Sequence, residues 1–132
     1  MLDDMELLDT VYSACWKNAE LAALLGNPMT PKARSERIHR EITPMSYATA
    51  DNVNFISMYF SSATETDNIY AIRGFLTVDY YCKSHSDIKK LKRIVTQILQ
   101  DMDIFCTSRA SIASDVKGVF IYSEKYRPLI WA

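Results

Sequence analysis

The chain has 132 residues, a formal net charge of −1 and 48% hydrophobic residues. This length predicts one domain, residues 1–132, with a core of its own, and the apolar content excludes a disordered chain. The even balance of charge disfavours specific nucleic-acid binding, because proteins that grip nucleic acid carry a clear basic excess.

The first part of the chain predicts two helices. Asp3 can cap the first of them, with Glu6 as its capping-box partner. Apolar residues then recur every three or four positions and form one face, Met5, Leu8, Val11, Tyr12, Cys15 and Trp16. Asn18 is expected to interrupt this helix and to start a short second one, which Gly26 and Pro28 end.

A third start signal follows. Thr30 can cap a helix of at most two turns, with Pro31 at its first position. From Ile38 to Ser46 the pattern is extended, although Pro44 limits regular pairing.

Two runs then predict a long β-hairpin, Asn54 to Ser62 and Tyr70 to Lys83, joined by a polar loop. The second run alternates. One face has Ile72, Gly74, Leu76, Val78, Tyr80 and Cys82, and the other has Arg73, Phe75, Thr77, Asp79, Tyr81 and Lys83. We expect helices to cover the first face and the second face to be largely exposed to solvent.

The clearest element is a helix over Asp87 to Met102. Ser84 and Asp87 have capping-box spacing, and an acid in the first turn suits the helix dipole. An apolar stripe runs along this helix, Ile88, Leu91, Ile94, Val95, Ile98, Leu99 and Met102.

Two further strands are predicted, Ile104 to Ala113 and Val119 to Lys125, with an apolar tail after Pro128. The predicted fold class is therefore α+β: a mainly antiparallel four-stranded sheet with a long β-hairpin and helices packed on one face.

No catalytic motif is found. The pair Cys82 and His85 has no orienting third group, and His39 stands alone. We expect no catalytic residue and no cofactor.

Metal and membrane sites are not expected either. Cys15, Cys82 and Cys106 stand far apart without CxxC spacing, so they predict buried thiols rather than disulfides or a zinc site. Asp101 and Asp103 are too few oxygen ligands for a cation. No apolar run approaches the roughly 20 residues of a membrane span. The acidic first residues are unlike a signal peptide, which predicts a cytoplasmic protein.

Two basic stretches remain. The first, with Lys32, Arg34, Arg37 and Arg40, is a candidate partner-facing surface, although a solvated face is the simpler interpretation. The second, from Lys89 to Arg93, lies on the outer side of the predicted helix.

The stretch AIRGFLTVDYYCKSHSDIKKLKRIVTQILQDM, Ala71 to Met102, resembles the tail-terminator or tail-completion (tail-to-head joining) proteins of long-tailed bacteriophages. In that family an alternating strand ends in a basic residue and Ser and runs into a helix with such a stripe. RIHREI, Arg37 to Ile42, and the LLG that ends the opening helices also fit this pattern.

The resemblance implies a non-enzymatic virion protein at the head–tail junction, assembled in the host cytoplasm. It would form a ring with itself, commonly a hexamer, that caps the tail tube and docks to the head connector. Candidate assembly contacts lie in the distal hairpin and the tail, Phe60, Ile69, Tyr70, Ile72, Leu129 and Trp131. The tail could instead fold back on its own domain.

One alternative function stays open. The chain could be a cytoplasmic small-ligand-binding or regulatory α+β module, with a pocket beneath Tyr80 lined by the Tyr-rich hairpin.

Overall fold

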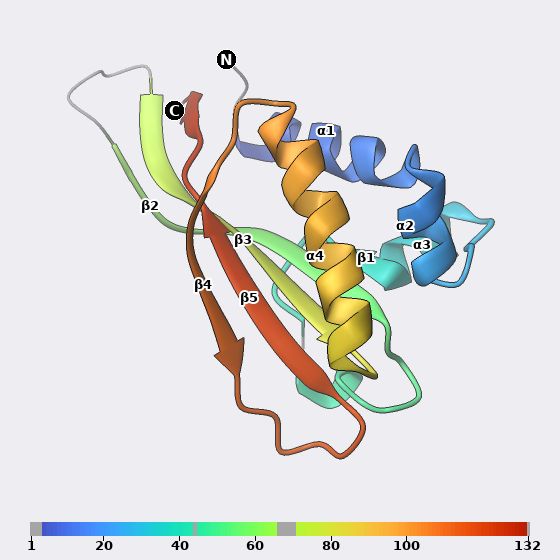
Figure 1. The fold of residues 1–132 in the computed structure, drawn as a ribbon. Helices are drawn as coiled ribbons and strands as arrows, with labels where there is room; N and C mark the ends of the chain where they lie inside the picture. The colour runs from blue at the N-terminus through green and yellow to red at the C-terminus, as the bar shows by residue number, and fades with distance from the viewer. Residues whose placement is uncertain (1–3, 44, 66–70, 132) are drawn as a thin grey trace.

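A twisted sheet is covered on one face by helices in the computed structural model, which describes residues 4–43, 45–65 and 71–131 (Figure 1). The helices are α1 (Asp4–Trp16), α2 (Ala19–Leu24), α3 (Pro31–Arg37), the 3-10 helix η1 (Met45–Tyr47) and α4 (His85–Gln100). The strands are β1 (Ile38–His39), β2 (Phe55–Glu65), β3 (Ala71–Cys82), β4 (Cys106–Ile112), β5 (Phe120–Tyr126) and β6 (Leu129–Trp131).

The described residues form a sheet of six strands, in the order β1-β2-β3-β5-β4, with β6 also paired to β3. The β1–β2 pair is parallel, and the other described pairs are antiparallel. The predicted α+β class is therefore confirmed, but the four-stranded sheet is wrong. Strand β6 was missed because its three residues are too few to show a period. Strand β1 is a two-residue part of the stretch from Ile38 to Ser46 that was predicted to be extended, but it was not counted as a strand of the sheet.

The predicted starts of α2, α3 and α4 are confirmed by their caps, whereas Asp3, the predicted cap of the first helix, lies outside the described residues. The Asn18 side chain accepts a hydrogen bond from the Leu21 backbone N–H, and Thr30 and Ser84 cap α3 and α4 in the same way. Helix α4 begins and ends two residues earlier than predicted, which is the usual uncertainty at helix ends.

The main core lies between the sheet and helices α1, α2 and α4. Leu76, Val78 and Tyr80 of β3 are fully buried in it. Leu91 and Ile94 of the α4 stripe belong to the same cluster, as the alternation of β3 and the stripe of α4 predict. This packing fixes which side of each strand points into the protein.

The prediction that the other face is largely wet is wrong for Thr77, Asp79 and Tyr81, which are all buried. The chain between β1 and β2 and the turn before β5 return over this face. A second apolar cluster forms there from Ala48, Phe55, Tyr81, Val119 and Ile121. Its members come from four separate segments, so no local sequence pattern predicts this cluster.

Candidate assembly surface

Three of the four candidate basic side chains are bound within their own chain. Arg40 forms a 2.6 Å ion pair with Asp9 of α1, and its guanidinium lies 4.3 Å from the centre of the Tyr12 ring. Arg34 donates a hydrogen bond to the backbone carbonyl of Pro28. The Arg40 contacts tie the residues after α3 to α1, and the Arg34 hydrogen bond ties α3 to the loop before it.

Arg37 has a structural role as well. Its Nη1 donates to the carbonyl oxygens of Asn52, at 2.6 Å, and Asn54, at 3.3 Å, and so joins the end of α3 to the start of β2. Lys32 is exposed. A partner-facing role for this stretch stays a prediction.

The candidate contacts of the hairpin and tail are only partly described. Phe60 is half-buried and packs against the main core. Ile69 and Tyr70 lie outside the described residues, as do the side chains of Ile72, Leu129 and Trp131. Their part in assembly stays a prediction.

The backbone of the tail folds back onto its own sheet. Leu129–Trp131 form β6, which pairs antiparallel with Ala71–Arg73 of β3. This position agrees with the interpretation that the tail completes its own domain.

Among the described strands, two edges lie free at opposite sides of the sheet (Figure 1). The short β1 pairs only with Ile56 and Ser57, so β2 has no strand on its outer side from Met58 to Glu65 among the residues described. At the other side, the described strands give β4 a single neighbour, β5.

Strand β4 has little of what usually protects an edge. Six of its seven residues are exposed, and Cys106 is half-buried. It contains neither proline nor lysine, the residues that natural proteins place on edges to block pairing. The register is irregular between Cys106 and Ser108 and then regular to Ile112. Residues 108–112 therefore offer a regular backbone edge with mostly small side chains.

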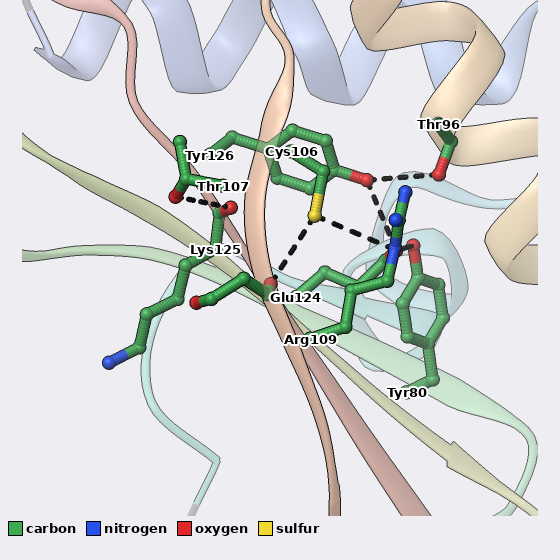
Figure 2. Close-up of polar contacts among 9 residues, drawn as sticks. Tyr80, Thr96, Cys106, Thr107, Arg109, Glu124, Lys125 and Tyr126 are labelled. Carbon is green, nitrogen blue, oxygen red and sulfur yellow. Dashed lines mark hydrogen bonds and ion pairs between the residues drawn. The ribbon is translucent and has the colours of Figure 1, made fainter.

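A buried carboxylate lies behind this edge (Figure 2). The Glu124 side chain, on β5, is 0% exposed. Its Oε1 accepts hydrogen bonds from the Tyr80 hydroxyl, at 2.8 Å, and the Tyr126 hydroxyl, at 3.1 Å. Its Oε2 accepts a 2.6 Å charge-assisted hydrogen bond from Nε of Arg109 on β4. The Cys106 thiol is a weaker donor to Oε2, at 4.0 Å. Burial of the charge is thus offset by a cation, two hydroxyl donors and this thiol.

Helix α4 joins the same network. The single proton of the Tyr126 hydroxyl goes to Glu124, so the Thr96 hydroxyl, 3.1 Å away, donates to Tyr126. The network therefore links β3, β4, β5 and α4 (Figure 2).

The pKa shifts around Glu124 keep these roles fixed. Burial raises the pKa of the Tyr80 phenol, and the Glu124 charge raises it further. Burial also raises the Tyr126 pKa. Both phenols therefore stay protonated and remain donors. The hydrogen bond to Glu124 raises the pKa of Arg109, which strengthens its cationic state.

This centre was not predicted from the sequence, although one signal exists. Tyr122, Glu124 and Tyr126 alternate on β5, so the acid occupies a position between two aromatic residues on one face. Arg109 lies directly opposite Glu124 in the β4–β5 register. An acid at a core-facing position requires a partner, but only the register identifies Arg109 as that partner.

Both histidines have local contacts. The Nε2 of His39 lies 2.9 Å from the Glu36 carbonyl, so Nε2 carries the proton, and Nδ1 accepts from the Thr43 hydroxyl. The same ring stacks on Phe55. His85 contacts the Phe120 ring, with 4.3 Å between the ring centres.

Cys15 and Cys82 are buried, as predicted, and are poor nucleophiles and poor metal ligands, whereas Cys106 is only half-buried. Burial raises the pKa of both Cys15 and Cys82 to about 12, so both stay protonated near neutral pH. Among the described residues, no cluster of three or more His, Cys, Asp and Glu side chains could bind a metal ion. None of the described helices is long and apolar enough to cross a membrane.

Two hollows mark the surface near α3. One, of about 460 Å³, is lined by Lys32, His39 and Tyr47 among others. The other, of about 490 Å³, lies between α2, α3 and the start of β2. Tyr80 is fully buried in the core and lines neither, so the pocket that the regulatory-module alternative expects does not coincide with them.

No protein-family model matches the chain, and no curated protein matches it. The solved structures that are similar in fold include a chain of the virion of a native gene transfer agent particle. The two chains align with a TM-score of 0.68, over 96% of this chain and 95% of that one, at 12% identity. They share a fold. The likeness spans almost the whole chain rather than a single motif.

Proposed function

We propose that this protein is a non-enzymatic structural subunit of a phage or phage-like virion. The observation that carries the proposal is the likeness to a chain of a gene transfer agent virion, which extends over almost the full length of both chains. Because each chain is covered almost completely, this chain is close to that virion component in size and in the order of its elements.

The finer proposal is a tail-terminator, or head–tail joining, subunit. It is supported by the strand and helix of Ala71 to Met102, which resemble that phage family in sequence and form β3 and α4 in the fold. Such a subunit would cap the tail tube and dock to the head connector. It would act at the head–tail junction after assembly in the host cytoplasm.

The proposed assembly is a hexameric ring. The edges of β2 and β4 are different surfaces at opposite sides of one sheet. Contacts between unlike surfaces repeat head to tail and close into a ring when the rotation per copy fits. The free edges are therefore suited to a cyclic assembly rather than to a two-fold dimer.

The side chains of types that could take part in catalysis have structural roles. Glu124 is enclosed by its donors, Cys15 and Cys82 remain protonated thiols, and His39 has both ring nitrogens bound. These contacts favour a part that acts by assembly.

Deletion of the gene in the host that makes the particle tests the proposal. Electron microscopy of the lysate should show filled heads and tails that are not joined, and the parental gene supplied in trans should restore joining. Joined particles of normal appearance in the deletion strain would contradict the proposal.

A further inference from the structure

We propose that β4 of one copy pairs with the free outer edge of β2 in the next copy, so that the sheet continues from subunit to subunit. This inference rests on the proposed assembly role and names the surface that performs it. The pairing would use backbone N–H and C=O groups, with little demand on side chains.

The first support is that both edges are available. Residues 108–112 of β4 form a regular ladder with β5 on one side only, among the described strands. Strand β2 continues in register with β3 from Met58 to Ser61, beyond the reach of β1. A free edge is a template for strand addition and is normally short, charged or covered.

The second support is that β4 is held in a fixed position although six of its seven residues are exposed. The Arg109–Glu124 ion pair holds the middle of the strand to the buried network. The neighbours of Arg109 are small, Ser108, Ala110 and Ser111. A strand that already has its final conformation loses less conformational entropy on pairing, and small side chains let another backbone come close.

The third support concerns which molecule pairs with these free edges. An edge could receive a strand from any protein, but the described strands of this chain leave two free edges at the two sides of one sheet. Pairing of β4 with β4 would leave β2 unused, whereas β4 with β2 uses both in every copy. A second copy of this chain is therefore the partner that satisfies both edges at once.

The test uses proline to remove one outward N–H from each edge. Successive N–H groups along a strand point to opposite sides, so of Ala110→Pro and Ser111→Pro one affects the β5 ladder and the other affects only the free edge. The variant that keeps the parental melting temperature is used. Phe60→Pro and Ser61→Pro, which lie within the regular stretch of β2, are compared in the same way. If neither β4 variant folds, lysines at Ala110 and Ser111 block that edge with the backbone intact.

Light scattering then measures the mass of each protein. Six copies of 15.1 kDa give about 90 kDa for the parental ring. Each edge variant alone should stay near the 15.1 kDa monomer. An equal mixture of the β4-edge and β2-edge variants should form a dimer of about 30 kDa, because only one intact pair of edges remains in it.

Several results would overturn the pairing. A β4-edge variant that still forms the parental ring, or a mixture that stays monomeric, removes the proposed contact but leaves the virion role untouched. A monomeric parental protein also overturns it, and the gene deletion then decides separately on the virion role. A β2-edge variant that still assembles while the β4-edge variant does not would assign β4 another partner.

Discussion

Replacement of Arg109 by methionine tests the buried centre. The substitution removes the cation from Glu124, which is 0% exposed, and keeps a long apolar side chain on β4. Loss of one partner of a buried ion pair costs roughly 3–5 kcal/mol. Here 43% of the Arg109 side chain is exposed, and Tyr80 and Tyr126 still donate to Glu124. We therefore expect a smaller loss, about 2–3 kcal/mol of unfolding free energy.

Urea melts at neutral pH measure this loss. A double-mutant cycle is completed with Glu124→Gln and the double variant. The loss of unfolding free energy caused by Arg109→Met should be smaller when the buried charge is absent. Arg93→Met is the matched control. Its ion pair with Glu20, at 3.1 Å, joins side chains that are 72% and 60% exposed, and such pairs contribute only about 0–1 kcal/mol.

One result would refute this reasoning. If Arg109→Met costs no more than Arg93→Met, and costs the same with Glu124→Gln as without it, then Arg109 does not stabilise the buried carboxylate. In that case β4 would not be fastened as described, and the support it lends to edge pairing would be lost.

Three further predictions follow from the packing and the pKa shifts. Leu91→Ala should cost about 2–5 kcal/mol in urea melts, whereas Lys90→Ala on the exposed side should cost almost nothing, and equal costs would contradict the α4 register. The Cys15 pKa rises from 9.0 to about 12 on folding. The buried neutral thiol therefore makes its full contribution to the free energy of unfolding below pH 9, and this contribution is lost between pH 9 and about pH 12. Cys15→Ala should flatten the fall of stability in this range by about 1.4 kcal/mol per pH unit, and an unchanged slope would contradict burial of the thiol. Deletion of residues 129–132 removes β6 and should lower the melting temperature of the monomer; an unchanged melt would show that this strand adds nothing to the domain.

The elements with strong local signals were predictable from the sequence. Helix α4 has a capping Ser84 and a long apolar stripe, and the hairpin has two runs rich in β-branched and aromatic residues. Such signals lie within one segment, so no knowledge of distant contacts is needed.

The features that were missed depend on distant contacts. Strands β1 and β6 are held in place by their longer neighbours β2 and β3 rather than by their own pattern. The cluster around Tyr81 combines separate segments, and the network of Glu124 requires the β4–β5 register. The basic stretch from Lys32 to Arg40 looked like a surface for partners, yet most of its arginines bind their own chain.

The central claim is that this chain is a ring subunit at the head–tail junction of a virion. Cryo-electron microscopy of the neck of particles from a host that carries this gene tests it most directly. The account predicts a closed ring of six copies of this fold between the tail tube and the head connector. A well-resolved neck in which no density fits this chain would contradict the claim.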